Sequence, residues 1–336
     1  MAAPEILTTV VGSYPVPDWL VALPSEQALI DATSVVLKTQ ELAGIDLIAD
    51  GELYRFDINH PDTNGMIDYF VRPLGGVRSQ IGRADMEAFS RVGAMQFRAK
   101  PAGVVEDALT PGTLDLVTAF ERSRNLTASP LKFTLTGPHM LSRTLLNHYY
   151  KSPGELAMAL AQVMAEQVKQ ITAEVIQLDE ANITGHPEDA DWAAPAINHI
   201  LEAVPGRKAV HLCFGNYGGQ TIQKGAWRFL IDFMNRLRAD HVILEMARRN
   251  QDEIAALRDL DERIGIGLGV IDIKTTVVEA PSEVARRIEQ AEKVLGPGRI
   301  QYIHPDCGFW MLKRSVADRK MQALVQGRNE FLGKKS

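Results

Sequence analysis

The sequence predicts an α/β protein folded as a (β/α)8 TIM barrel. Three features predict this fold: eight short apolar runs, amphipathic stretches between most of them, and polar side chains where the runs end. The 336 residues exceed the usual size of one domain, but α/β barrels reach this length as a single unit. We therefore expect one barrel domain over residues 1–336.

The apolar runs are predicted to be the barrel strands. They are too short for helices, rich in branched aliphatic residues and bounded by turn residues, as is typical of strands buried on both faces. The runs are residues 6–14, 47–52, 131–137, 175–180, 208–216, 242–247, 264–272 and 300–307.

The segments between the runs show helical patterns. Residues 225–238 place apolar side chains three and four positions apart, which forms one apolar stripe. Residues 281–295 begin with Pro-Ser-Glu and end before Gly-Pro, so start and stop signals bracket them. Residues 25–43 and 153–173 follow the same pattern. Strands that alternate with helices in this way predict a parallel sheet closed into a barrel.

One connection departs from this alternation. The link between the second and third strands, about residues 53–130, is far longer than a usual βα loop. Its Gly/Arg-rich piece and its alternating piece predict a hairpin and an extra helix. We expect this insertion to form a substrate lid at the barrel mouth; a purely structural cap is the alternative.

Charge and composition exclude several classes of function. The formal net charge is -6, so we expect no nucleic-acid partner and no membrane partner. No apolar run reaches the roughly 20 residues that span a bilayer, and the N-terminus lacks the basic start and apolar core of a signal peptide. We expect a cytoplasmic protein. Its two cysteines are then expected to be a metal or catalytic pair rather than a disulfide.

Polar side chains mark the ends of nearly all the runs. Barrel enzymes work at the C-terminal ends of their strands, where the loops converge. The residues at these positions are Ser13, Asp50, Glu52, Asp179, Glu180, His211, Cys213, Glu245, Asp272, Lys274, Asp306 and Cys307.

His211 and Cys213 are the most informative of these residues. Residues two apart in a strand point to the same face, so both side chains can share one metal. Glu245 lies at the same level on the neighbouring strand, and Cys307 ends the last strand. Two thiolates, an imidazole and a carboxylate suit Zn²⁺. The alternative is structural: two buried cysteines that pack as small apolar groups and one hydrogen-bonded core histidine.

Six motifs resemble one family, in order, over nearly the whole chain. They are Gly12-Ser13-Tyr14-Pro15, Asp50-Gly51-Glu52, Thr136-Gly137-Pro138, Gln177-Leu178-Asp179-Glu180, His211-Leu212-Cys213 and Pro305-Asp306-Cys307-Gly308. The chain resembles the catalytic C-terminal barrel of the cobalamin-independent methionine synthase family, in its single-barrel form. The last two motifs together are specific, whereas the others are weak singly.

The resemblance implies a zinc-dependent S-methyltransferase that makes methionine from homocysteine. It implies that Zn²⁺ is held by His211, Cys213, Glu245 and Cys307. It further implies that Ser13, Glu52 and Asp179 hold the amino-acid substrate, with the two carboxylates pairing with its ammonium. The methyl donor is expected to be a methyl-folate or a methyl-corrinoid carried by a partner protein. The oligomeric state is left open.

Three departures from the family pattern leave the substrate open. The N-terminal barrel of the two-barrel members is absent, Ala181 replaces a common proline, and Lys274 stands where methionine synthases have a histidine. The alternatives are another zinc-dependent alkyltransferase, such as an epoxyalkane:coenzyme M transferase, and a non-catalytic zinc-binding barrel. A coenzyme M enzyme is expected to present a cation to the sulfonate, with candidates Arg55, Arg143 and Lys274. Three residues are candidates to protonate the leaving group: Lys274, Asp272 and His304.

Overall fold

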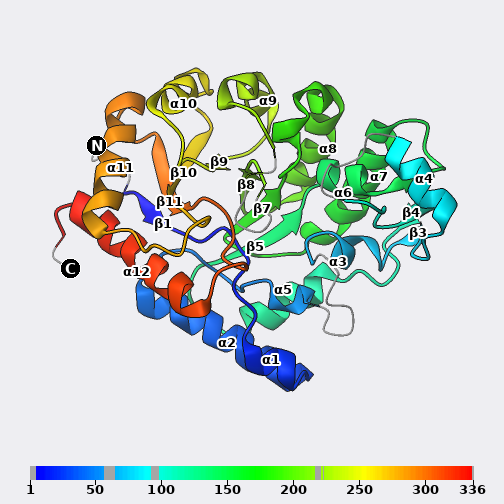
Figure 1. Cartoon of the computed structure of the whole chain (residues 1–336), viewed down its shortest axis with the longest axis horizontal. Helices are drawn as coiled ribbons and strands as arrows, with labels where there is room; N and C mark the ends of the chain where they lie inside the picture. The colour runs from blue at the N-terminus through cyan, green and yellow to red at the C-terminus, as the bar shows by residue number, and fades with distance from the viewer. Residues whose placement is uncertain (1–4, 57–64, 92–97, 216–220, 222, 335–336) are drawn as a thin grey trace.

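A computed structural model describes residues 5–56, 65–91, 98–215, 221 and 223–334. Eight parallel strands form one sheet in the order β1-β11-β10-β9-β8-β7-β5-β2. A parallel bridge between Thr9 and Leu47 joins the two edge strands, and helices surround the sheet (Figure 1). The predicted (β/α)8 barrel is confirmed.

Each barrel strand lies in a predicted run or begins one residue before it. The strands are β1 (Leu7–Thr8), β2 (Ile48–Ala49), β5 (Leu131–Thr136), β7 (Val175–Asp179), β8 (Arg207–Leu212), β9 (His241–Leu244), β10 (Gly265–Ile271) and β11 (Ile300–Pro305). They are shorter than the runs at their C-terminal ends. Most of the polar residues singled out above therefore lie just past the strands, in the loops that form the barrel mouth.

Helix α2, one of the helices that cover the barrel, begins and ends at recognisable signals. The Ser25 side chain accepts a hydrogen bond from the Ala28 amide at the start of α2, which ends at Gly44 with φ 82°. The α-helices are α1 (Asp18–Ala22), α2 (Glu26–Ala43), α3 (Asp68–Val71), α4 (Arg83–Arg91), α5 (Leu116–Arg124), α6 (Pro138–Thr144), α7 (Pro153–Val168), α8 (Ala190–Ala203), α9 (Ile231–Arg236), α10 (Gln251–Ala256), α11 (Pro281–Leu295) and α12 (Arg314–Phe331). Short 3₁₀ turns are η1 (Leu53–Arg55), η2 (Ile183–Gly185), η3 (Pro187–Asp189), η4 (Trp227–Phe229) and η5 (Leu257–Asp259).

The helix predicted over residues 225–238 is wrong in one respect. The segment divides into η4 and α9, because Leu230 adopts φ -114° and ψ 0°, outside α-helical geometry. Its apolar stripe is nevertheless buried, as the spacing predicted.

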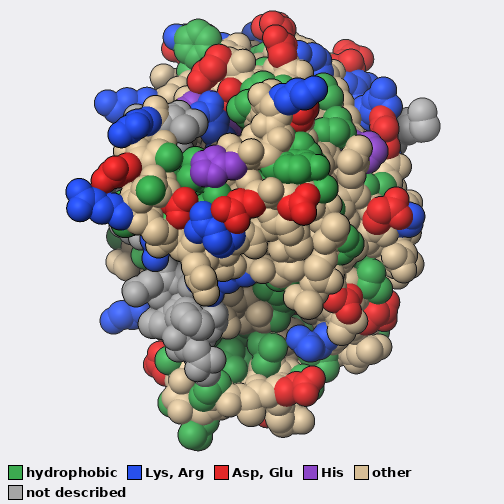
Figure 2. Space-filling view, turned by 90° about the vertical axis from the view of Figure 1, so that its right-hand side faces the viewer, with side chains coloured by type: hydrophobic (Ala, Val, Ile, Leu, Met, Phe, Trp, Pro, Cys, Tyr) green, Lys and Arg blue, Asp and Glu red, His purple; other side chains and the backbone are tan. Residues whose placement is uncertain are grey.

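The connection between β2 and β5 supplies two strands of a second, three-stranded sheet, whose third strand follows β5. Strands β3 (Gly75–Arg78) and β4 (Val104–Thr110) pair antiparallel, and β6 (Leu146–Asn147) adds in parallel beside β4. Helices α3, α4 and α5 lie in the same connection, of which residues 57–64 and 92–97 fall outside the described part. Figure 2 views the molecule from the side on which α4 lies in Figure 1, and acidic and basic side chains intermix on that face.

The barrel is filled by side chains, as this architecture requires. Six strand or strand-flanking residues form an inner cluster: Val11, Leu47, Val175, Ala209, Ile243 and Tyr302. A much larger cluster packs between the sheet and the helices. Within the described ranges, no helix is long and apolar enough to span a bilayer.

Candidate functional site

Three of the four predicted metal ligands meet at the barrel mouth. His211 lies in β8, Cys213 follows that strand, and Cys307 follows β11. Their potential ligand atoms all lie within 4.8 Å of one another. His211 and Cys213 are buried, Cys307 is partly exposed, and neither cysteine is in a disulfide. One imidazole nitrogen and two sulfurs are the donor types that zinc and other soft transition metals prefer.

The imidazole of His211 is oriented as a metal ligand would be. Its Nδ1 lies 2.9 Å from Oδ1 of Asp179, which sits opposite His211 on the neighbouring strand β7. Its Nε2 is buried and finds no hydrogen-bond partner in the described part of the chain. Metal-binding histidines commonly bond a carboxylate through one nitrogen and offer the other to the metal. An unsatisfied buried nitrogen facing two thiols therefore fits a metal ion.

Close contacts within this cluster shift the pKa values of His211 and Cys307. Burial lowers the pKa of His211, but the hydrogen bond with Asp179 and the closeness of the Cys307 thiol outweigh it and raise that pKa to about 10. The hydrogen bond with Cys213, together with burial, raises the pKa of Cys307 well above its ordinary value. The His211 ring and the Cys307 thiol thus hold their protons firmly, and a metal ion would have to displace these protons.

Glu245, the fourth predicted ligand, has other partners. It follows β9 and is 3% exposed. Its Oε1 accepts a 2.5 Å hydrogen bond from Nζ of Lys274, and its Oε2 accepts one of 3.2 Å from the Phe214 amide. Among the described residues, its carboxylate is not part of the close group that His211 and the cysteines form.

The predicted substrate residues lie at the same end of the barrel as the thiol cluster, and Asp179 contacts His211 directly. Glu52 is the sole non-glycine residue of the described ranges with positive φ, at 60°, a strained conformation that clusters at functional sites. Its carboxylate accepts a 2.6 Å hydrogen bond from the Thr134 hydroxyl and lies 3.2 Å from the Arg55 guanidinium. Burial raises the pKa of Glu52, Arg55 opposes this shift, and the charge of Asp179 adds to it.

Glycines let the chain pass close to these side chains. A Cβ on Gly12 would lie 2.1 Å from Oε1 of Glu52, and one on Gly308 would lie 1.9 Å from the Ser13 hydroxyl. The Ser13 carbonyl accepts a 2.8 Å hydrogen bond from the Phe309 amide. The first motif and the last motif are therefore packed against each other, with Ser13 between them.

Lys132 is a buried charge that sequence reasoning missed. It lies in β5, is 1% exposed, and its Nζ donates to the Val10 carbonyl. Burial lowers its pKa to about 7, against the opposing charges of Asp179 and Glu52. A lysine within an otherwise apolar run was the available signal.

The three candidate acids differ in their surroundings. The Lys274 ammonium contacts Glu245 beside the thiols, whereas Asp272 is paired with Arg248 at 2.6 Å. His304 bonds the Pro305 carbonyl through Nδ1, and burial lowers its pKa to about 3. His304 is therefore neutral at ordinary pH and a poor proton donor.

The cations considered for a sulfonate already have anionic partners. Besides Lys274 with Glu245, Arg55 pairs with Glu52, and Nε of Arg143 lies 2.7 Å from Asp189. A sulfonate would have to compete with a carboxylate at each of them.

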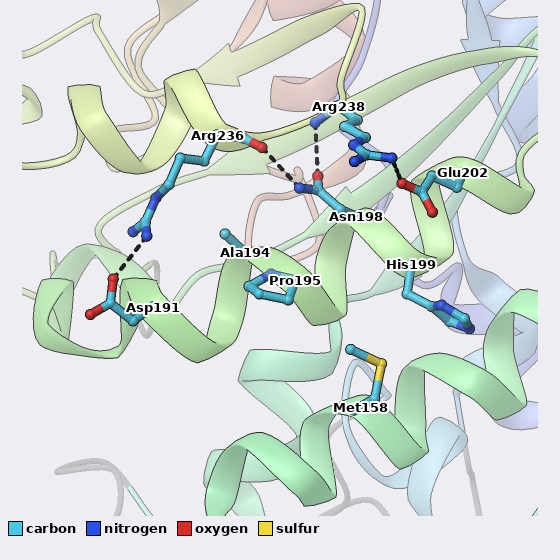
Figure 3. A pocket seen from close by; sticks show the side chains of 9 residues that line it. All are labelled: Met158, Asp191, Ala194, Pro195, Asn198, His199, Glu202, Arg236 and Arg238. Carbon is cyan, nitrogen blue, oxygen red and sulfur yellow. Dashed lines mark hydrogen bonds and ion pairs between the residues drawn. The ribbon is translucent and has the colours of Figure 1, made fainter.

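A separate cavity of about 360 Å³ lies in the helical layer, between α7, α8 and the residues that follow α9 (Figure 3). Its charged groups are already paired: Arg236 with Asp191, and Arg238 with Glu202. None of the predicted site residues lines it.

Fold and site together define a barrel protein with a histidine–dithiol cluster at the C-terminal ends of its strands. Residues 6–329 match the family model described as "Cobalamin-independent synthase, Catalytic domain". The chain therefore belongs to the cobalamin-independent synthase family, and the resemblance seen in the motifs is confirmed.

Known relatives cover almost the full chain. It is 30% identical over 347 residues to the methionine synthase of Thermococcus kodakarensis, covering 97% of this chain and 94% of that protein. It is 29% identical to the methionine synthase of Sulfurisphaera tokodaii, covering 96% and 92%. The fold matches the B12-independent methionine synthase of Shewanella sp. W3-18-1, solved with selenomethionine, with TM-score 0.80, 24% identity and 98% of each chain covered.

Proposed function

We propose that this chain is a zinc-dependent methyltransferase that transfers a methyl group to the thiol of homocysteine to form methionine. The observation that carries the proposal is the meeting of His211, Cys213 and Cys307 with an unsatisfied imidazole nitrogen among them. Family membership and relatives named methionine synthases over almost the whole chain support the choice of reaction.

The residues present fit a zinc ion. His211, Cys213 and Cys307 would hold it, and Glu245 is the candidate for a fourth ligand. Zn²⁺, when bound, deprotonates a substrate thiol and keeps its sulfur as the nucleophilic thiolate at neutral pH. Asp179 fixes the tautomer and orientation of the His211 ring through their 2.9 Å contact.

The substrate's amino-acid end would be held across the pocket. The Asp179 side chain is buried and the Glu52 side chain is 8% exposed. Burial raises the pKa of Glu52, and the charge of Asp179 adds to this rise. An ammonium between them would relieve that repulsion. Ser13, packed against Gly308 beside Cys307, would contact the substrate near its sulfur. The carboxylate partners of Arg55, Arg143 and Lys274 favour homocysteine over a sulfonate-bearing thiol.

The leaving group of the methyl donor needs a proton. Of the three candidates, Lys274 is best supported, because its ammonium lies beside Glu245 at the thiol cluster. Asp272 would hold the Lys274 backbone amide at 2.8 Å rather than donate. The neutral ring of His304 is the weakest candidate.

The remaining elements of the proposal concern the donor and its access. The donor would be a methyl-folate or a methyl-corrinoid protein, and the insertion at about residues 53–130 would serve as a lid on a single barrel domain. Both ligating cysteines must stay reduced, which favours a cytoplasmic site of action.

Isothermal titration of the zinc-loaded protein against homocysteine, coenzyme M and 2-mercaptoethanol tests the substrate. We expect homocysteine to bind most tightly and to be methylated when a donor is supplied. The matched variant Glu52→Gln keeps the shape of the side chain but removes its charge. It should weaken homocysteine binding and leave binding of 2-mercaptoethanol, which has no ammonium, unchanged. Tighter binding of coenzyme M than of homocysteine would contradict the proposal.

A further inference from the structure

The contact between Glu245 and Lys274 is an ion pair shielded from water. The Lys274 side chain is 1% exposed and the Glu245 side chain 3%, with Nζ and Oε1 2.5 Å apart. At this burial the two charges interact strongly, and separating them would leave each without compensation. The pair therefore holds the Glu245 carboxylate beside the Lys274 ammonium.

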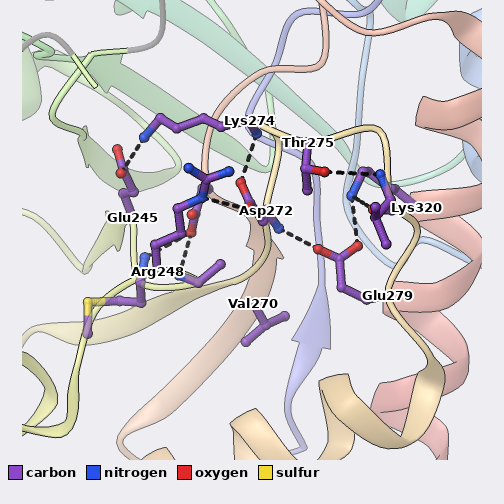
Figure 4. Close-up of polar contacts among 12 residues, drawn as sticks. Glu245, Arg248, Val270, Asp272, Lys274, Thr275, Glu279 and Lys320 are labelled. Carbon is purple, nitrogen blue, oxygen red and sulfur yellow. Dashed lines mark hydrogen bonds and ion pairs between the residues drawn. The ribbon is translucent and has the colours of Figure 1, made fainter. Parts of the chain in front are cut away.

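Lys274 is held in place by contacts that do not involve the metal site (Figure 4). Its backbone amide donates to Oδ1 of Asp272 at 2.8 Å, and the Asp272 amide donates to Oε1 of Glu279 at 2.8 Å. Glu279 in turn accepts a 2.8 Å hydrogen bond from Lys320 in α12, whose side chain is fully buried. These hydrogen bonds hold the loop after β10, which carries Lys274, in place.

Glu245 is tethered beside the thiol cluster from its other side. Its Oε2 accepts from the amide of Phe214, the residue after Cys213, at 3.2 Å. Its backbone carbonyl accepts from Nε1 of Trp227 at 3.3 Å. The carboxylate is therefore next to the three-residue cluster, but both of its oxygens are already engaged.

We propose that Lys274 is a positioning residue that competes with the metal for Glu245 and so keeps the fourth coordination position open to the substrate sulfur. The inference rests on the zinc centre proposed above. Drawing Glu245 onto the metal would leave the Lys274 ammonium buried without its partner, which opposes that step. When a substrate sulfur occupies the position instead, Glu245 stays with Lys274 and both charges remain satisfied.

A double-mutant cycle on zinc affinity tests this role with the metal alone. Wild type, Lys274→Met, Glu245→Gln and the double variant are titrated with Zn²⁺ against a competing chelator. In Lys274→Met the freed Glu245 should join the metal and raise zinc affinity at least about fivefold. In wild type, Glu245→Gln should change zinc affinity by less than about threefold. In the double variant the gain should disappear.

Homocysteine binding provides a second readout that a purely structural role would not produce. Zinc-loaded Lys274→Met should bind homocysteine more weakly than wild type, and the double variant should recover the lost affinity. Lys274→Arg keeps a cation beside Glu245, so it should resemble wild type in both measurements. If Lys274→Met does not fold, the effect of Glu245→Gln on zinc affinity is measured in the Lys274→Arg background.

Two results would overturn the inference. One is equal zinc affinity in wild type and Lys274→Met. The other is a large loss of zinc affinity on Glu245→Gln in the wild-type or Lys274→Arg background, which would make Glu245 a resident ligand. If zinc binds as expected but homocysteine is not methylated, the proposed reaction fails while the zinc cycle still stands.

Discussion

The buried lysine inside the barrel gives a sharp prediction for stability against pH. Lys132 is 1% exposed, and burial lowers its pKa from 10.5 to about 7. Between these two values the unfolded chain holds a proton that the folded chain has lost. The free energy of unfolding therefore rises with pH, by up to about 1.4 kcal/mol per pH unit.

The variant Lys132→Met fills a similar volume and cannot titrate. At pH 7 and below it should be more stable than wild type, because wild type buries a charge there. This advantage should shrink as Lys132 loses its proton, by about 2.3 kcal/mol between pH 7 and pH 9 from integrating the linkage relation.

Urea unfolding of the metal-free proteins at pH 7, 8 and 9 measures this difference. Lys38→Met is the control, because the Lys38 side chain is 64% exposed and its removal should change stability equally at each pH. A stability difference between wild type and Lys132→Met that stays constant within about 0.5 kcal/mol over this range would refute the linkage.

Three further predictions concern the metal cluster and the core beside it. Cys307→Ser should no longer retain stoichiometric zinc after dialysis against a mild chelator, because a hydroxyl is a poor substitute for a thiolate ligand; metal analysis that finds one zinc per chain would contradict this. Asp179→Ala should weaken zinc binding by about 10–100-fold through loss of the His211 hydrogen bond, and chelator competition measures the change. Trp227→Ala should lower the free energy of unfolding by about 3–5 kcal/mol, because the ring is fully buried and packs edge-on against Phe214; urea denaturation would show it, and a loss below about 1 kcal/mol would mean that the site repacks.

The arrangement of His211, Cys213 and Cys307 could be predicted because it depends on simple periodicities. Residues two positions apart in a strand point to the same face, and the parallel strands of a barrel bring their C-terminal ends to one rim. Those rules do not depend on side-chain detail. Strand assignment and motif resemblance together thus brought three of the four predicted ligands, whose potential ligand atoms lie within 4.8 Å of one another, to one site.

The partners of Glu245 could not be predicted in the same way. Its contact with Lys274 depends on the course of the loop after β10. Glu279 fixes this loop and is itself held by Lys320, which is distant in sequence. The left-handed backbone of Glu52 also has no local signal, since the residue is not glycine. In both cases tertiary contacts decide a local conformation, which sequence patterns do not encode.

The charges around Glu52 and Asp179 support the proposal of an amino-acid thiol as substrate. Asp50 and Asp179 are buried, and the Glu52 side chain is 8% exposed. Burial raises the pKa of both Asp50 and Glu52 even though the Arg55 guanidinium opposes it. Lys132 supplies only part of a positive charge near neutral pH, because burial lowers its pKa to about 7. The carboxylates are therefore short of positive charge, which an incoming ammonium would supply. Asp179 is shared by both ends of the pocket, since the same side chain bonds His211 and repels Glu52. An ammonium bound near Asp179 would consequently weaken its pull on the His211 proton, which links recognition of the amino group to the chemistry at the sulfur.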